Sequence, residues 1–286
     1  MCASSTSRGR ARGGPGGGAA APGRPQDAAV LEALYAEWNR RELVHPDPLE
    51  FVHRYADPRD REVVGLLAAS LAYGRVAQIL RNVETVLAAL GPSPAASVAG
   101  RDRPRLRAAL RGFRHRFTTG ADVFALLDGA GRLIERCGSL EQAFLAGMGS
   151  GDDTVVPALG RFAEGLCGPS GRPGGNLLPE PGKGSACKRL HLFLRWMVRR
   201  DEVDPGVWTA VSPALLVVPL DVHMHRIAAS LGATARRQAD LRTALEATEW
   251  FNRLSPGDPV KYDFALTRMG MRGLWPRDTN GEDRPC

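Results

Sequence analysis

The sequence has no uninterrupted run of about 18 apolar residues, so no segment is predicted to span a membrane. Cysteine is scarce as well: the five cysteines lack the paired spacing of a zinc site or an iron–sulfur cluster, so we expect no metal and no cofactor. Unpaired thiols are typical of the reducing cytoplasm, where we expect the protein to reside. Alternating β-branched runs are nearly missing, which argues against a large sheet.

The two ends of the chain have little apolar content. Residues 1–26 consist mainly of Gly, Ala, Arg and Pro, and they lack both acidic residues and the apolar centre of a secretory signal. We predict that this tail and residues 277–286 are disordered. The tail supplies four of the positive charges in a formal net charge of +7. The remaining body is modestly basic, which fits a polyanionic partner.

Between the ends, residues 27–276 show helical periodicity nearly everywhere. Several apolar stretches end at a glycine that is suited to cap the C-terminus of a helix. Proline- and glycine-rich breaks fall at 91–94 and 168–184. With 43% hydrophobic residues the chain is able to bury a real core, so we predict an all-α fold in one helical domain.

One helix stands out, because it starts with a lysine and is otherwise almost wholly apolar. Residues 184–200 read GSACKRLHLFLRWMVRR, and a helical projection places apolar side chains on well over half of the circumference. The remaining strip holds Lys188, His191, Arg195 and Arg199, all within roughly 80° of one another. A buried helix with one cationic strip is expected to line a site.

A second segment places an aspartate at the start of a helix. Residues 217–232 read VVPLDVHMHRIAASLG, in which Asp221 is placed to cap the helix and Gly232 ends it. His223 and His225 are two residues apart, so on a helix they point roughly 200° away from each other and do not chelate one ion. The alternative for Asp221 is that it is only a cap.

These two segments resemble those of the helix-hairpin-helix DNA glycosylases. PLDVHMHRIAASLG is similar to their VDTHVxR segment, and GSACKRLHLFL is similar to the LPGVGxKTA hairpin of the members with lyase activity. The resemblance implies that Lys188 is the nucleophile and Asp221 the catalytic aspartate, and that the fold is of the helix-hairpin-helix type. The separation of 33 residues between Lys188 and Asp221 is closer to that of the archaeal 8-oxoguanine glycosylase branch than to that of the common bacterial members.

The chain also resembles an uncharacterised bacterial protein family over nearly its full length. The resemblance runs from FVHRYADPRDREVVGLLAASLAYGR to DPVKYDFALTRMG, and it implies no activity. In the second of these stretches we interpret Lys261 and Asp263 as structural residues of a helix that packs on the core.

The hairpin departs from the glycosylase pattern at one glycine. If Gly184 is the first glycine, Ala186 takes the place of the second, whose missing side chain lets backbone amides approach a phosphate. An alternative register uses Gly182 and Gly184 as the pair. In either register the hairpin and active-site segment spans about 180–232.

We expect the other site residues to bind the DNA substrate. Trp208 or Trp250 would stack on the extruded base, although packing in the core is the alternative for both. Tyr73, Arg75 and Gln78 are candidates for filling the gap that this base leaves in the duplex. The residues predicted to bind substrate are Gly182, Gly184, Ser185, Arg195, Arg199, Trp208 and His223.

Excision of a base followed by strand cleavage requires a neutral amine that attacks C1′ of the sugar and forms an imine. A free lysine is almost wholly protonated at neutral pH, so Lys188 would have to be desolvated and set among other cations, for which Arg195 and Arg199 are the candidates. If these arginines do not act in this way, they bind phosphate or form a solvated face. A carboxylate such as Asp221 would stabilise the developing positive charge and move protons.

The sequence therefore predicts a monomeric DNA glycosylase with lyase activity that acts on damaged duplex DNA, with an oxidised purine as the expected base. A non-catalytic DNA- or RNA-binding helical module with the same fold is the first alternative. A hydrolase of free nucleosides is the second, because it would keep a buried aspartate without needing the basic tail or the hairpin.

Overall fold

The computed structural model describes residues 25–100, 103–167, 177–180 and 184–275. In this part of the chain, thirteen α-helices and one two-stranded sheet form, which confirms the predicted all-α class. None of the described helices is both long and apolar enough to cross a lipid bilayer. The first described helix begins at Pro25, two residues before the predicted start of the domain. Most of the predicted tail, the predicted C-terminal segment and Gly182 lie outside the described residues.

The sheet lies between the sixth and the seventh helix of the described residues. The first six helices are α1 (Pro25–Trp38), α2 (Leu49–Val52), α3 (Pro58–Ser70), α4 (Val76–Leu90), α5 (Pro94–Ala99) and α6 (Arg103–Ala109). The strands are β1 (Arg114–His115) and β2 (Thr118–Thr119). The later helices are α7 (Gly120–Cys137), α8 (Leu140–Leu145), α9 (Val156–Leu166), α10 (Lys188–Val198), α11 (Val222–Ser230), α12 (Leu241–Leu254) and α13 (Asp263–Met271). Two 3₁₀ turns are η1 (Arg41–Leu43) and η3 (Pro213–Leu215).

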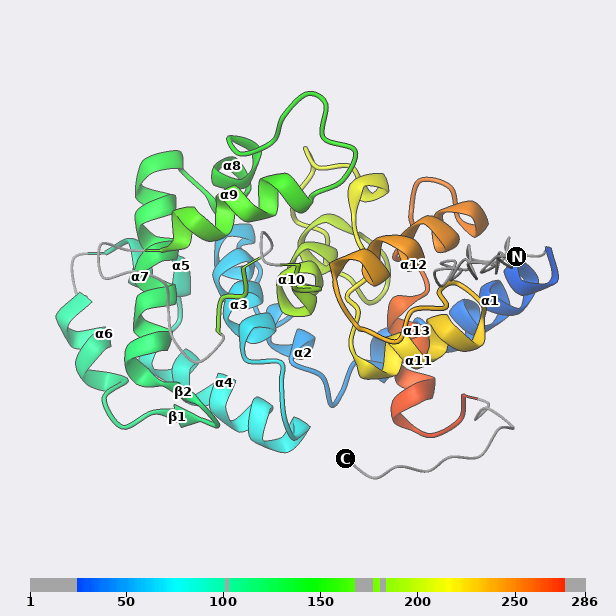
Figure 1. Ribbon diagram of the computed structural model, residues 1–286. Helices are drawn as coiled ribbons and strands as arrows, with labels where there is room; N and C mark the ends of the chain where they lie inside the picture. Colours follow the sequence, from blue (N-terminus) through cyan, green and yellow to red (C-terminus); the bar gives the residue numbers. More distant parts are fainter. Residues whose placement is uncertain (1–24, 101–102, 168–176, 181–183, 276–286) are drawn as a thin grey trace, which may run out of the picture.

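Figure 1 shows α3 and α10 side by side in the middle of the molecule, with a group of helices on either side. Helices α4 to α9 form one group, and α1, α11, α12 and α13 form the other. Helix α1 packs against α12 and α13, so the start and the end of the described chain lie in the same group. Helices α3 and α10 therefore lie between the two groups.

The central pair of helices packs closely because α3 has a glycine at the contact. A Cβ added to Gly65 would lie 2.8 Å from Cε of Met197 and 3.5 Å from the ring of Phe193. Phe193, Trp196 and Met197 are fully buried, as the wide apolar arc of this helix predicts. Burial of α10 on most sides holds Lys188, its first residue, at a fixed place between the helix groups.

The hairpin of β1 and β2 is an exception to helical periodicity that the sequence analysis did not predict. Its strands pair Arg114 with Thr119 and His115 with Thr118, which leaves two residues in the turn. Thr119 then starts α7, because its side chain and that of Asp122 form a reciprocal capping box. The hairpin thus ends where a strong helix start signal begins.

Candidate functional site

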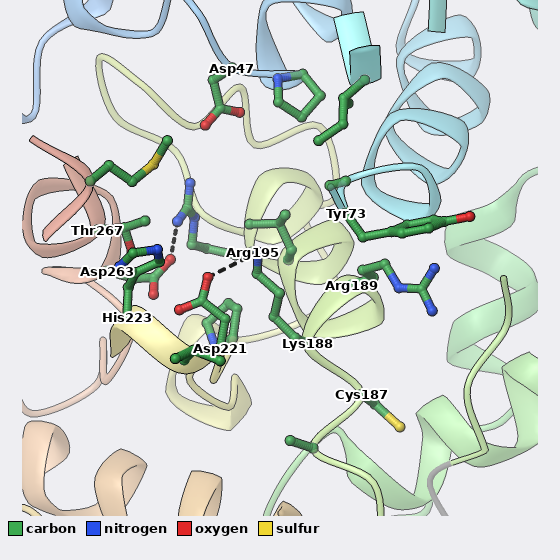
Figure 2. Close-up of a pocket in the computed structure, with 18 of the residues that line it drawn as sticks. Asp47, Tyr73, Cys187, Lys188, Arg189, Arg195, Asp221, His223, Asp263 and Thr267 are labelled. Carbon is green, nitrogen blue, oxygen red and sulfur yellow. Dashed lines mark hydrogen bonds and ion pairs between the residues drawn. The ribbon is translucent and has the colours of Figure 1, made fainter. Parts of the chain in front are cut away.

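Two helix starts bring together the lysine and the aspartate that the sequence singled out. Helix α10 begins at Lys188, directly after Cys187, whose backbone is left-handed with φ of 43°. Helix α11 is capped by Asp221, whose Oδ1 accepts a hydrogen bond of 2.8 Å from the amide of Met224. The other oxygen, Oδ2, lies 3.2 Å from Nζ of Lys188 (Figure 2). One carboxylate therefore caps a helix and pairs with the lysine at once.

The pair lies in a cavity of about 620 Å³ between the two helix groups. This volume is in the range of sites that hold small molecules. The side chains of Lys188 and Asp221 are 31% and 23% exposed, so both are reachable from the cavity. Its walls include Asp47 and Pro48, Tyr73 and Gly74, Ser185 to Arg189, Asp221 to His223, and Asp263, Phe264 and Thr267.

The charges around Asp221 favour its ionised form. Burial raises the pKa of this carboxyl, but the Lys188 ammonium and the Met224 amide outweigh burial and hold the pKa below its ordinary value. The resting site is therefore an ion pair. An ionised carboxylate this close to the lysine nitrogen is able to stabilise a positive charge that develops on a group bound to that nitrogen.

A second carboxyl, Asp263, lies on the wall of the same cavity, and the sequence analysis interpreted it only as structural. It is 5% exposed and forms a buried ion pair with Arg195 through Oδ2. Its Oδ1 has no hydrogen-bond partner among the described residues. Burial raises the pKa of Asp263 to about 6; Arg195 opposes this shift and the negative charge of Asp221 adds to it. Its separation from Asp221 along the chain left no local pattern by which to find it.

Arg195 and His191 on α10 do not act as uncompensated cations beside Lys188, contrary to the prediction from the sequence. Arg195 does line the cavity, but its guanidinium is 3% exposed and contacts both Asp204 and Asp263. His191 is 1% exposed, and burial lowers its pKa to about 4, so it is neutral at neutral pH. Carboxylates that lie later in the chain compensate the arginine, so Lys188 does not lie among uncompensated cations.

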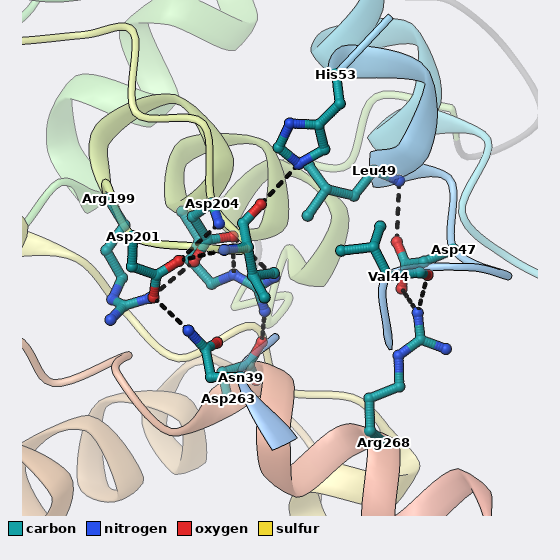
Figure 3. A network of polar contacts seen from close by, with 12 residues as sticks. Asn39, Val44, Asp47, Leu49, His53, Arg199, Asp201, Asp204, Asp263 and Arg268 are labelled. Carbon is teal, nitrogen blue, oxygen red and sulfur yellow. Dashed lines mark hydrogen bonds and ion pairs between the residues drawn. The ribbon is translucent and has the colours of Figure 1, made fainter. Parts of the chain in front are cut away.

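Arg199 does not line the cavity at all. Its guanidinium is buried in a polar network with Asp201 and Asp204 (Figure 3). It also lies 2.8 Å from Oδ2 of Asp258. The prediction that Arg199 binds substrate is wrong, because its guanidinium is buried and outside the cavity lining. A buried guanidinium needs partners, and three carboxylates of the fold serve as the partners of this one. Its role is to join segments of the fold.

The two tryptophans proposed to stack on an extruded base lie in the core. Trp208 is 3% exposed, and its Nε1 donates a 2.7 Å hydrogen bond to Oε1 of Glu62. Its ring packs edge-on against Phe193 and tilted against Phe144. Trp250 is fully buried. Neither ring is accessible to a base, so this prediction is wrong for both residues.

The segment before α10 is described from Gly184 onward, so the register that starts at Gly182 lies outside the described residues. Gly184 has a left-handed backbone with φ of 75°, a conformation that favours glycine. Its carbonyl accepts a 3.0 Å hydrogen bond from the amide of Leu241, and Ser185 pairs with Asp240. Both Gly184 and Ser185 are exposed, so the segment is anchored to the start of α12 while one side faces solvent.

The rim of the cavity contains two further residues from the sequence analysis. His223 lines the cavity and is exposed. Tyr73 also lines it, and the guanidinium of Arg189 lies 4.9 Å from the centre of its ring. Arg75 and Gln78 are exposed and lie outside the cavity lining. Of the three candidates for filling the gap in a duplex, only Tyr73 is at the cavity.

Comparison with known proteins supplies a family but no activity. No curated protein and no solved structure matches the chain. One family model, described as "Protein of unknown function (DUF2400)", matches residues 47–272. The match includes Asp47 at the edge of the cavity and all of α10, α11 and α13. Since it covers well over half of the sequence, the chain belongs to the DUF2400 family of proteins of unknown function.

Proposed function

We propose that this protein is a DNA glycosylase with lyase activity that excises a damaged base, with an oxidised purine as the expected substrate. The observation that supports this most is the 3.2 Å contact between Nζ of Lys188 and Oδ2 of Asp221 in a cavity of about 620 Å³. The resemblance to glycosylases assigned roles to the same two residues. A nucleophilic amine beside a carboxylate is the minimum that this reaction needs.

The reaction begins with loss of a proton from the Lys188 ammonium to solvent, which frees the electron pair of the amine and leaves Asp221 ionised. The amine attacks C1′ of the target nucleotide, and the bond from C1′ to the base breaks. The base leaves with the bonding electrons and takes up a proton. Opening of the sugar ring then gives an imine between Lys188 and C1′.

The strand is cleaved in the next step. Loss of a proton from C2′ of the imine expels the 3′ phosphate with its bonding electrons. Asp221, ionised in the resting site, stabilises the positive charge that develops at C1′ and is positioned to carry the protons. The lysine thus forms the covalent bond, and the aspartate acts on charge and protons.

The sequence makes a trapping experiment unusually clear, because Lys183, Lys188 and Lys261 are its only lysines. Duplexes with different oxidised bases are incubated with the protein and borohydride, which reduces an imine to a stable amine. We expect a covalent protein–DNA adduct with at least one duplex and its complete loss in Lys188→Ala. The adduct should persist in Lys261→Ala, because Lys261 is 2.6 Å from Glu32 on α1 and away from the cavity.

Three results would contradict the proposal. Trapping that persists in Lys188→Ala and disappears in Lys183→Ala would assign the nucleophile to the other lysine. Absence of an adduct together with salt-dependent DNA binding would indicate a non-catalytic binding module, because phosphate contacts release counterions. Release of base from free nucleosides, independent of salt, would indicate a nucleoside hydrolase.

A further inference from the structure

The hairpin of β1 and β2 exposes an aromatic ring at its turn. Phe117 is 72% exposed, more than any other exposed large hydrophobic side chain of the described residues. The guanidinium of Arg116 lies 5.7 Å from the centre of this ring. These two residues form the turn, and we call them the hairpin tip. A phenylalanine at such a position buries almost nothing in this chain, so its apolar surface is available to a partner.

The hairpin tip lies beside the mouth of the cavity. A Cβ added to Gly74, which lines the cavity, would be 3.0 Å from Cδ of Arg116. The hydroxyl of Tyr73, also in the cavity wall, donates a 2.9 Å hydrogen bond to the carbonyl of His115. The rings of Tyr73 and His115 meet edge-on at 4.5 Å. Arg116 of the hairpin tip therefore lies next to the part of the cavity wall that Tyr73 and Gly74 form.

The hairpin is also held firmly. Nδ2 of Asn82 on α4 donates to the carbonyl of Arg114 at 3.1 Å and lies 2.8 Å from Nδ1 of His115. The hydroxyls of Tyr73 and Thr118 are 2.6 Å apart. A surface that is fixed before binding loses little conformational entropy when a partner binds.

The surroundings of the hairpin tip are strongly positive. Residues 71–120 contain nine arginines and two carboxylates. One carboxylate, Glu84, pairs at 2.6 Å with Arg54, which lies outside this segment. Three of the arginines, Arg75, Arg114 and Arg116, are exposed, and no ion pair joins them to a carboxylate of the described residues. Such a surface complements a polyanion.

We propose that the hairpin tip is a second DNA contact, at which Phe117 stacks on an unpaired base next to the nucleotide in the cavity. Arg75, Arg114 and Arg116 then bind the phosphates on either side of that base. This inference rests on the proposed function for the choice of DNA as the partner. An exposed aromatic ring with arginines around it binds unstacked bases without needing a particular sequence, because every base has a π-face and every nucleotide a phosphate.

The stacking is tested by binding without chemistry. Full-length Lys188→Ala protein is titrated against a duplex that carries an abasic-site analogue and, next to it or opposite it, the fluorescent base 2-aminopurine. Stacking on Phe117 should change the 2-aminopurine fluorescence. Replacing Phe117 by Ala should abolish this change and weaken binding roughly tenfold, which corresponds to about 1.4 kcal/mol of stacking energy. Phe117→Trp should restore both signals, because an aromatic ring returns.

A matched control is Val30→Ala, because Val30 is 56% exposed on α1, in the other helix group. This change should leave both the fluorescence response and the affinity unaltered. Unchanged affinity and fluorescence in Phe117→Ala would overturn the proposal. An equal loss of affinity for a fully paired duplex would also overturn it, because the contact would then not depend on an unpaired base.

The phosphate contacts have a separate readout. Arg114→Ala and Arg116→Ala should each reduce the slope of log K against log salt concentration by about one unit. Arg253→Ala should leave the slope unchanged, because Arg253 lies on α12 and pairs with Glu249 at 3.0 Å. If all three variants have the same slope as the wild-type protein, Arg114 and Arg116 do not contact the phosphates of DNA.

The two proposals fail in different ways. A Phe117-dependent fluorescence change without any borohydride adduct would retain the hairpin contact and refute the lyase. A Lys188-dependent adduct with no effect of Phe117 would retain the lyase and refute the hairpin contact.

Discussion

At the scale of single residues, Asp221 divides two tasks between two oxygens. Oδ1 accepts the Met224 amide at the start of α11, and Oδ2 faces the ammonium of Lys188. An uncharged oxygen is sufficient for the first task, whereas the second task needs a negative charge, so the capping and catalytic interpretations of this residue are separable. Both interpretations are open from the sequence, and the geometry accommodates both.

Asp221→Asn is predicted to separate the two tasks. The amide oxygen keeps the cap, so the free energy of unfolding should change by less than the ~1 kcal/mol typical of a lost cap. The rate of borohydride trapping should fall by orders of magnitude, because a charged group beside the reacting carbon has become neutral. Asp221→Ala is the comparison, since it loses both tasks and should lower both the trapping rate and the stability to urea. Equal trapping rates in wild type and Asp221→Asn would show that Asp221 acts only as the cap of α11.

The pH dependence of the same pair checks the electrostatics. Because the pKa of Asp221 is lower in the folded protein than its ordinary value of 3.8, the ionised carboxylate contributes stability above that pH. This contribution is lost as the pH falls through the lowered pKa. The difference in unfolding free energy between wild type and Asp221→Asn should therefore shrink on acidification, as measured by urea unfolding at several pH values.

At the scale of elements, glycines allow helices to approach one another closely, although glycine has a low helix propensity. A Cβ on Gly129 of α7 would lie 2.1 Å from the carbonyl oxygen of Leu166 at the end of α9. Gly131, two residues later, has the same distance to the carbonyl oxygen of Val98 at α5. These backbone atoms have no freedom to move away as a flexible side chain would, so α7 holds its neighbours at a fixed spacing.

Gly129→Ala is predicted to destabilise the fold by about 1–3 kcal/mol, the range for an overfilled core. Gly160→Ala in α9 is the matched control, because a Cβ there meets nothing within 4 Å. That change should stabilise the protein by about 0.5–1 kcal/mol through higher helix propensity. Urea unfolding measures both changes. Equal effects of the two substitutions would show that the close approach of α7 and α9 is not maintained in solution.

At the scale of the whole molecule, buried charges join segments that are distant in the chain. Arg199, at the end of α10, contacts Asp204, Asp258 before α13, and the hydroxyl of Tyr35 on α1. Asp204 is fully buried and also contacts Arg195. The network thus joins α1, α10 and α13 through Tyr35, Arg199, Arg195 and Asp263.

Arg199→Gln is predicted to lower the free energy of unfolding by about 3–5 kcal/mol, because it leaves buried carboxylates without their counter-charge. The salt dependence of DNA binding should not change, since this guanidinium does not reach the cavity or the surface. Arg200→Gln is the control one residue along: Arg200 is exposed, so its loss should alter stability by at most about 0.5 kcal/mol. A shallower salt slope with unchanged stability in Arg199→Gln would return this residue to the DNA interface.

The sequence alone determined the features that depend on local geometry. The spacing of apolar residues was sufficient for the helical class and for the buried arc of α10, in which Phe193, Trp196 and Met197 are fully buried. The cap at Asp221 was readable for the same reason: a side-chain oxygen at a helix start reaches amides only three residues away. The resemblance suggested that Lys188 and Asp221 act in one site, but it did not give the distance between Nζ and Oδ2.

Only the tertiary structure decided which charges and which rings meet. The sequence of α10 predicts Arg195 as part of a cationic strip, but in the folded protein Asp263, 68 residues later, contacts its guanidinium. Phe113 and Phe117 lie in the same arginine-rich stretch, yet Phe113 is 8% exposed in the core and Phe117 is 72% exposed in the turn between β1 and β2. Periodicity and capping act over three or four residues, whereas ion pairs and burial depend on loops that close over tens of residues. No local window of sequence contains that information.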